Sequence, residues 1–230
     1  LWLWTALAIS SSCFVTSGVA FLWQNTVMQL WDLGQGWSFA CFIFSTGIGG
    51  FLGVVFGPKI FDGYLGGFED ASGKALCLLW CKRLMLVAAL CGSACTLLLV
   101  EKSARLVYSN HDVVVPWHLA VLVACVFVMF FCINAIQGTL YGINTAAAEV
   151  EMRTFAAGLT VSFQNVFGYA FGPLLPGAFA GLVGKSVVRV WPDVRWDPRA
   201  LDGAKFGTGM AFALAGAWFL FVTTRMAAVR

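Results

Sequence analysis

Charged side chains are scarce in this chain: Asp, Glu, Lys and Arg together make up 11% of its 230 residues, against 60% hydrophobic residues. A soluble domain carries roughly 25% charged residues, so the chain lacks the groups with which a soluble fold covers its surface. The mean hydropathy of +0.84 points the same way. The composition therefore excludes an ordinary soluble domain and indicates a protein that lies in a membrane.

The sequence also lacks the usual patterns of metal sites and catalytic centres. Its eight cysteines include no CxxC pair and all lie in or beside apolar runs, and there are only two histidines. Cysteine is commonly a small buried apolar residue, so we expect these thiols to pack, with no metal and no cofactor. No combination of His with Asp, Glu or Ser lies deep in an apolar run. We therefore expect no enzyme, and the absence of a basic stripe with interleaved aromatics gives no support for nucleic-acid binding.

What the chain has instead is a series of six uncharged apolar runs. Each run meets or approaches the ~20 residues, at 1.5 Å per residue, that cross a ~30 Å hydrocarbon core. We therefore expect an all-α, multi-pass integral membrane protein with six transmembrane helices in a single domain over residues 1–230. The expected spans cover residues 3–31, 37–58, 84–100, 116–141, 156–184 and 206–224.

The flanks of these spans carry two further indications. Leu1 already lies at the edge of a span, so we expect the chain to be part of a longer protein. Lys and Arg divide evenly between the two sides of the expected membrane, so the positive-inside rule does not orient the chain.

Spans one to three resemble spans four to six. The first member of each triplet holds side-chain amides at mid-membrane depth, and the third member is short and plain. The second members are rich in glycine and proline: Gly47, Gly49, Gly50, Gly53, Gly57 and Pro58 match in kind Gly168, Gly172, Pro173, Pro176, Gly177 and Gly181. Paired triplets of this kind are typical of the inverted three-plus-three repeats of secondary transporters.

The amides are the candidate functional residues. Asn134, Gln137 and Tyr141 follow one another at i, i+3 and i+7, on one helical face. A buried amide is costly unless it is hydrogen-bonded, so this face must meet protein or water. It is either the wall of a substrate cavity or a set of hydrogen bonds between helices, and the same two readings apply to Gln24 and Asn25. The candidate cavity residues are thus Gln24, Asn25, Asn134, Gln137 and Tyr141. For Asn144, near the membrane edge, we expect hydrogen bonds between helices.

Two glycine patterns predict close helix packing. Gly49, Gly53 and Gly57 recur every four residues, which places a smooth strip on one helix face. In the fifth span Pro173 and Pro176 each lack an N–H, so we expect a bent helix there, with Gly172 and Gly177 flanking the bend.

Several of these segments resemble the C-terminal half of a major facilitator superfamily transporter, of the spinster-like and related protist kind. The run from Gly49 to Asp62, followed by Gly66-Gly67, is similar to the family's glycine-rich second helix and its loop motif. Glu149 to Arg153, followed by Ala157-Gly158, resembles the loop before its fifth span. Gln164 to Gly168 and Gly172 to Gly177 are similar to the helix that follows.

The resemblance implies a six-helix half of a twelve-helix protein that works by alternating access, with the N-terminal half of the same protein as its partner. It implies that both chain ends lie in the cytoplasm and that spans one and four line the cavity. It also implies a cytoplasmic gate formed by ion pairs of Asp62, Glu149 and Arg153.

Together these observations predict a membrane transporter for a small organic, neutral or lipid-like solute, because the expected cavity wall is uncharged and partly aromatic. The alternative is a membrane scaffold or sensor that has the same fold but does not transport. Substrate, coupling ion, direction and membrane do not follow from the sequence.

Overall fold

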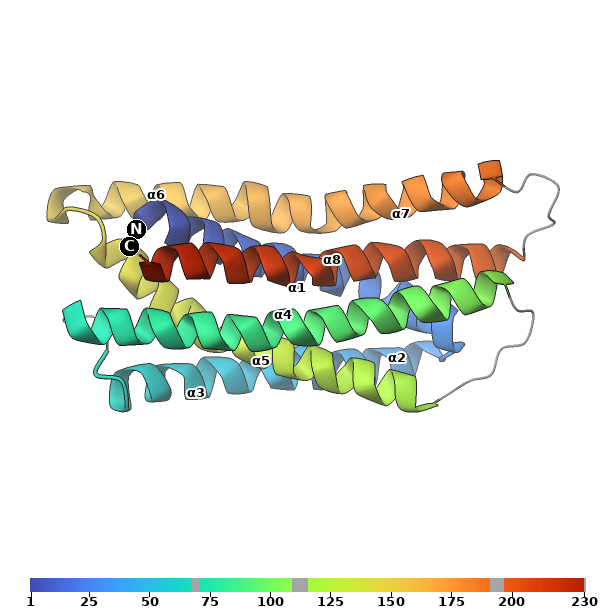
Figure 1. Cartoon of the computed structure of the whole chain (residues 1–230), viewed down its shortest axis with the longest axis horizontal. Helices are drawn as coiled ribbons and strands as arrows, with labels where there is room; N and C mark the ends of the chain where they lie inside the picture. The colour runs from blue at the N-terminus through green and yellow to red at the C-terminus, as the bar shows by residue number, and fades with distance from the viewer. Residues whose placement is uncertain (68–70, 109–115, 191–196, 230) are drawn as a thin grey trace.

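The computed structural model describes residues 1–67, 71–108, 116–190 and 197–229, and this part of the chain is built of helices (Figure 1). Two of the elements, η1 and η3, are π-helical, and η2 is a short 3₁₀ turn. The elements are α1 (Trp2–Trp31), α2 (Gln35–Phe42), η1 (Ile43–Ile48), α3 (Gly49–Gly63), α4 (Ala71–Tyr108), α5 (Pro116–Ala146), η2 (Val150–Met152), α6 (Arg153–Phe163), η3 (Gln164–Ala170), α7 (Phe171–Val190) and α8 (Pro198–Val229).

Six helical stretches are long and apolar enough to cross a membrane, which confirms the expected all-α architecture with six candidate spans. Spans one, three, four and six are the single helices α1, α4, α5 and α8. Span two joins α2, η1 and α3, and span five joins η2, α6, η3 and α7. Span five forms one long, shallowly bowed ribbon in Figure 1.

The helices extend well beyond the uncharged runs. α4 has 38 residues, which is about 57 Å of helix, more than the ~40–45 Å of a bilayer with its headgroups. Its first turns carry Lys74, Lys82 and Arg83. Long basic side chains can lie along an apolar surface and keep their charge in water, so charge does not end the helix where it ends the apolar run.

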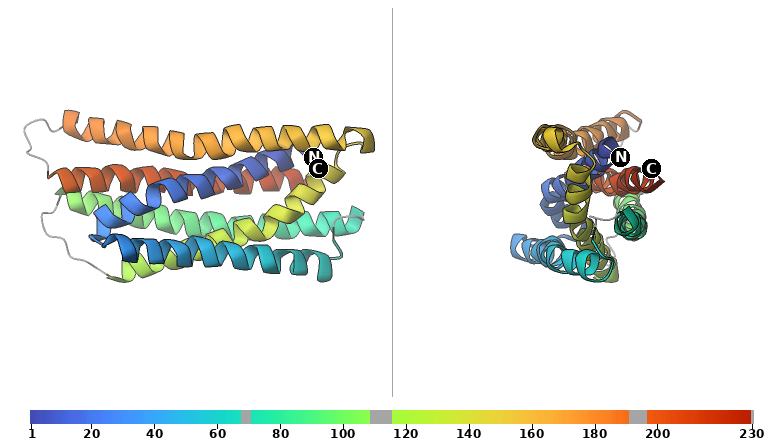
Figure 2. Two further views of the ribbon diagram at one scale, coloured as in Figure 1. Left: turned by 180° about the vertical axis from the view of Figure 1, so that it is seen from behind. Right: turned by 90° about the vertical axis from the view of Figure 1, so that its left-hand side faces the viewer.

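The spans lie side by side along the long axis of the molecule (Figures 1 and 2). The chain ends, the end of α3 and the start of α6 all lie at one end of the bundle. The ends of α1, α4 and α7 lie at the other. Asp62 and Arg153 are therefore at the same end, as the six-span count requires.

The first helix of each triplet packs against the second and third helices of the other triplet. α1 packs against η3, α7 and α8, whereas α5 packs against η1, α3 and α4; α4 and α8 pack along each other. The end-on view in Figure 2 shows α1 and α5 near the centre, with spans two and five on either side of them. α1 is the most buried span: 67% of its apolar stretch of 18 residues is buried. Spans two and five are the least buried, with 22% of the corresponding stretch.

Glycine sets the separation between span two and α5. A Cβ on Gly53 would stand 2.5 Å from the Phe131 carbonyl oxygen, and one on Gly57 would stand 2.3 Å from that of Ala135. One turn earlier, a Cβ on Gly49 would stand 2.8 Å from the Phe127 carbonyl oxygen. The glycine strip thus lies directly on the backbone of α5.

Span five meets α1 in the same way. A Cβ on Gly172 would stand 2.8 Å from the Phe14 carbonyl oxygen and would also overlap the Ser17 hydroxyl. Ser17 donates a hydrogen bond of 3.2 Å to the Gly168 carbonyl oxygen. These contacts fix η3 and the start of α7 on the middle of α1.

Gly177 does not share this packing, because a Cβ there would have no atom of another helix within 4 Å. Five residues separate Gly177 from Gly172, a rotation of about 140° around the helix, so it faces away from α1. Pro176 lies inside α7, and Pro173 lies in its first turn, directly after the π-helical segment η3.

Candidate functional site

A cavity of about 760 Å³ lies between α1, α5 and spans two and five, and it is open on one side. α1 lines it with residues between Ser12 and Phe21, and α5 lines it with residues between Phe130 and Gln137. Both stretches are at the middle of their helices, so the cavity lies halfway along the bundle.

The polar lining of the cavity is uncharged. α1 contributes hydroxyl groups, α5 contributes two amides, and spans two and five contribute one hydroxyl group each. These polar residues are Ser12, Thr16, Ser17, Thr46, Asn134, Gln137 and Tyr169. The rest of the wall includes Phe21, Phe42, Phe51 and Phe130, so rings and hydrogen-bonding groups alternate around the same space.

Asn134 and Gln137, which the helical spacing placed on one face, both line this cavity. Asn134 donates a hydrogen bond of 2.9 Å to the Phe130 carbonyl oxygen in its own helix, which leaves its carbonyl oxygen free to accept. The Gln137 amide lies 3.9 Å from the Cys13 sulfur on α1. Both amides therefore face protein and the cavity.

Behind this wall, Gln164 connects three elements. It accepts a hydrogen bond from the Tyr141 hydroxyl, and its amide nitrogen lies 3.2 Å from the Cys13 sulfur and 3.4 Å from the Tyr169 hydroxyl. The Gln164 side chain is buried. Tyr141, expected to line the cavity, instead supports it through Gln164 and is not among the lining residues.

Sequence reasoning assigned no site role to Gln164, Cys13 or Tyr169. The available signal was the adjacent amide pair Gln164-Asn165 within an apolar run, the same pattern that drew attention to Gln24-Asn25. Cys13 and Tyr169 carry no comparable signal, because only the packing of α1 on η3 brings them together.

Gln24 and Asn25 lie outside this cavity. Gln24 has its amide nitrogen 3.8 Å from the Met28 sulfur in its own helix, and Asn25 is exposed. Both follow Phe21, the last cavity-lining residue of α1, on the way to the helix end at Trp31. The structure therefore does not bring Gln24 and Asn25 together with Asn134 in this cavity.

Asn144 joins three helices, which confirms the expectation of hydrogen bonds between helices. Its amide nitrogen donates to the Trp2 carbonyl oxygen at 3.0 Å and to the Thr5 hydroxyl at 2.8 Å, both on α1. Its carbonyl oxygen accepts a hydrogen bond of 2.8 Å from Thr160 on α6. With 1% of its surface exposed, Asn144 ties α5 to α1 and α6 beside the chain ends.

The expected gate residues Asp62, Glu149 and Arg153 are all exposed. Within the described parts of the chain, none of the three forms an ion pair in this conformation. Nor do the described residues include a group of three His, Cys, Asp or Glu side chains placed to hold a metal ion.

The chain matches no protein-family model, no curated protein and no solved structure.

Proposed function

We propose that this chain is one six-helix half of a membrane transporter of the major facilitator type, which moves a small uncharged organic solute by alternating access. One observation carries the proposal: an open-sided cavity, lined by uncharged polar and aromatic side chains, lies halfway along the helices between the two least buried spans.

The open side of the cavity needs a cover. Amide and hydroxyl groups that face hydrocarbon are costly, and polar residues at membrane depth face protein or water-filled space. The proposed cover is the second, N-terminal half of the same protein, across a solute path. Spans two and five, on either side of the opening, would form the contact with that half.

The packing of the spans supports an inverted three-plus-three repeat. Span one contacts spans five and six, and span four contacts spans two and three, which is the exchange that a two-fold relation between the triplets produces. Spans two and five also each contain a π-helical segment next to a glycine contact. Such segments in α-helices occur frequently at functional sites.

The chemistry of the cavity favours a neutral or amphiphilic solute. Its lining contains no Asp, Glu, Lys or Arg, so a fully charged solute would find no counter-charge from this half. The amides of Asn134 and Gln137 can hydrogen-bond a polar group, while rings such as Phe51 and Phe130 contact an apolar body.

At the end of the bundle that holds the chain termini, Asp62, Glu149 and Arg153 would form the gate. They are unpaired and exposed in the present conformation. In the proposed cycle they form ion pairs when the solute path closes at the cytoplasmic end and separate when it opens.

Solute uptake into proteoliposomes tests this function. The full-length protein would be reconstituted, and the entry of radiolabelled uncharged solutes measured, among them a hexose and a monoacylglycerol. We expect saturable uptake of at least one of them. The variant Gln137→Leu should lower it by about tenfold or more, since a lost hydrogen bond and an unpaired partner cost ~1–3 kcal/mol.

The matched control is Asn25→Leu, the same kind of change on an exposed amide outside the cavity. It should leave uptake close to wild type. Saturable solute binding without entry into the vesicles would overturn the proposal in favour of the sensor. Equal losses in the two variants would show that the cavity does not hold the solute.

A further inference from the structure

A second cavity lies along the line of contact between α7 and α8, which we call the α7–α8 seam, away from the solute cavity. A recess of about 510 Å³ opens there over the first half of α1, and five phenylalanine rings line it: Phe14, Phe167, Phe171, Phe212 and Phe219. Its hydroxyl groups, on Ser10 and Ser11, donate to carbonyl oxygens of their own helix at 2.9 and 2.6 Å. The recess therefore presents no free donor and suits a hydrocarbon chain.

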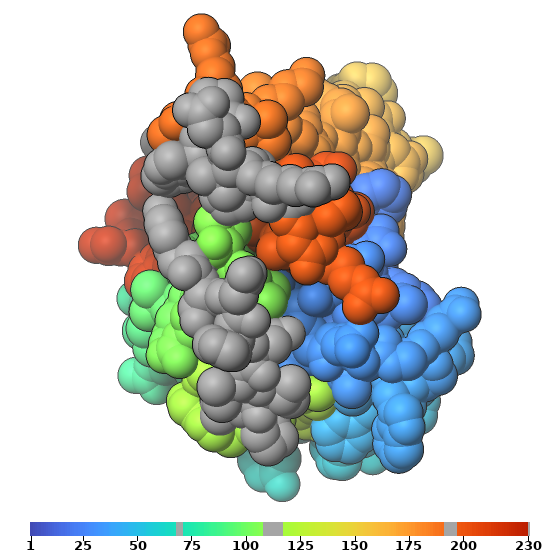
Figure 3. Space-filling view, turned by 90° about the vertical axis from the view of Figure 1, so that its right-hand side faces the viewer, coloured from blue at the N-terminus to red at the C-terminus, as the bar shows by residue number. Residues whose placement is uncertain are grey.

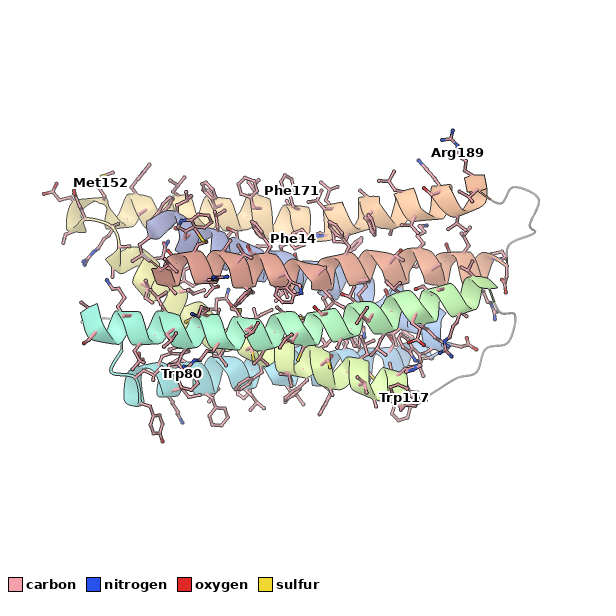
Figure 4. All side chains as sticks on the ribbon, in the orientation of Figure 1. Phe14, Trp80, Trp117, Met152, Phe171 and Arg189 are labelled. Carbon is pink, nitrogen blue, oxygen red and sulfur yellow. The ribbon has the colours of Figure 1, made fainter. Side chains whose placement is uncertain are left out.

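The same seam ends in a basic recess of about 490 Å³ at the far end of α7. Among the described residues, Lys185, Arg189 and Lys205 line it together with one acid, Asp202, which lies 3.8 Å from the Lys205 ammonium group. Figure 3 looks onto this end, where the end of α7 lies next to the start of α8. Arg189 lines the outer edge of this recess, and its side chain projects from the last turn of α7 on the side away from α8 (Figure 4). Three cations against one carboxylate leave the recess with a net positive charge.

The two recesses lie in line. On α8, Lys205, Phe212 and Phe219 are separated by seven residues, which places them on one face of the helix. On the side of the apolar recess that faces the basic one, Phe212 of α8, which lines the apolar recess, stacks on Phe179 of α7 with ring centroids 5.0 Å apart. Both rings are partly exposed, at 38% and 39%, so the seam between the recesses is an accessible apolar surface.

The spacing of the two recesses matches one lipid leaflet. Ten residues of α8 separate Lys205 from Ala215 in the apolar recess, which is about 15 Å of helix. Half of a ~30 Å hydrocarbon core has the same depth. A headgroup at Lys205 would thus bring the end of its acyl chain among the phenylalanine rings.

We propose that the α7–α8 seam binds one anionic phospholipid, with its phosphate at Lys185, Arg189 and Lys205 and one acyl chain lying over the Phe179–Phe212 pair into the phenylalanine recess. Anionic lipid headgroups are attracted to clusters of Lys and Arg near the membrane surface, and this recess offers three such side chains at one end of the bundle. The site is separate from the solute cavity, because Gly168 and Gly172 pack directly on α1 between the two. It does not depend on the transport function.

Native mass spectrometry of the full-length protein tests the site. The detergent-purified protein is titrated with dioleoyl-phosphatidylglycerol, with dioleoyl-phosphatidylcholine of the same chains, and with inorganic phosphate. We expect one phosphatidylglycerol to bind well before phosphatidylcholine. The triple variant Lys185→Gln, Arg189→Gln, Lys205→Gln should lower this affinity by about 100-fold, because each basic side chain near an anionic headgroup contributes roughly fivefold.

Two further variants separate the parts of the site. Ala215→Trp fills the apolar recess from an exposed position, and it should lower phosphatidylglycerol affinity while all three basic groups remain. The control Lys74→Gln, Lys82→Gln, Arg83→Gln removes the same charge at the opposite end of the bundle. It should leave the affinity unchanged within about twofold, because charges that far away are screened. Circular dichroism and size-exclusion profiles establish that each variant is folded.

Several results would overturn the proposal. Equal affinity for the two phospholipids would show that the basic recess does not recognise the headgroup. An equal loss of affinity in the two triple variants would show that only the net charge of the protein matters, and not the position of the basic residues. Displacement of phosphatidylglycerol by inorganic phosphate at similar concentration, or no effect of Ala215→Trp, would show that the acyl chain does not occupy the seam.

Discussion

At the scale of the residue, the polar side chains of the bundle fall into two groups. Serine and threonine hydroxyls mostly donate to a carbonyl oxygen three or four residues back in their own helix, as Ser10 and Thr224 do. A side-chain amide has both N–H donors and a carbonyl acceptor, and its own helix cannot pair all of them. Asn144 and Gln164 therefore hydrogen-bond to other helices. Among the polar side chains, the amides are therefore the ones whose substitution removes contacts between helices.

The variant Asn144→Leu should lower the free energy of unfolding by about 1–2 kcal/mol. Hydrogen bonds between membrane helices contribute ~0.6–2 kcal/mol each, but Thr5 and Thr160 keep acceptors in their own helices after the change. Unfolding in mixed detergent micelles with increasing SDS measures the difference. The control Asn25→Leu, at an exposed amide with no hydrogen bond among the described residues, should change stability little; an equal loss there would remove the role of the helix-joining contacts.

Which amides share a cavity could be predicted only in part. The spacing of Asn134 and Gln137 is enough to predict that their side chains lie together, because residues on one face of a helix meet the same neighbour. Gln24 and Asn25 were misplaced because depth along a helix does not say which neighbour a side chain meets. Gln164 and Cys13 meet only when α1 packs on η3, and that contact depends on glycines at long sequence separation.

At the scale of the element, spans two and five differ from the other four. Each is interrupted by a π-helical segment, and each packs through glycine on a central helix. The expectation of a close glycine contact came from a four-residue spacing that is readable in the sequence. The π-helical segments were not predicted, since neither Ile43–Ile48 nor Gln164–Ala170 has a composition that distinguishes them from α-helix.

The variant Gly172→Leu should impair transport more than membrane insertion. Leucine favours insertion, but its side chain would overlap Phe14 and Ser17 of α1. Overpacking costs ~1–3 kcal/mol, so we expect solute uptake to fall by about tenfold or more while the amount of inserted protein stays normal.

Gly177→Leu provides the matched control on the same helix, since that position has open space around it. It should insert like the wild-type protein and leave the contact between α7 and α1 intact. If Gly172→Leu transports at the wild-type rate, the close contact between α7 and α1 has no part in the function.

At the scale of the whole molecule, the hydrophobic pattern determined the number of spans and therefore the side on which each loop lies. The arrangement of the spans around the cavity could not be read from that pattern, because every span is apolar on nearly all faces. In the structure this arrangement follows from the contacts of the two central helices: α1 packs on spans five and six, and α5 packs on spans two and three. Charge gave no orientation, because Lys and Arg divide evenly between the two ends.

An even number of spans predicts that epitope tags placed directly before α1 and directly after α8 lie on the same side of the membrane. A tag inserted between α7 and α8 should lie on the opposite side. Protease accessibility in sealed vesicles distinguishes these positions. Tags at the two chain ends that are cleaved from different sides would contradict the six-span topology.

The wide turns of η1 and η3 divide the bundle into compliant and stiff parts. π-Helical turns have a different hydrogen-bond register and occur as local interruptions of α-helices, whereas α4 and α8 run unbroken for 38 and 32 residues against each other. The latter pair forms a rigid frame, and deformation concentrates in the two interrupted helices that border the cavity. Backbone amides of Ile43–Ile48 and Gln164–Ala170 should then exchange with deuterium sooner than those in the middle of α4 and α8. Uniform protection along all six spans would show a bundle that moves as one body.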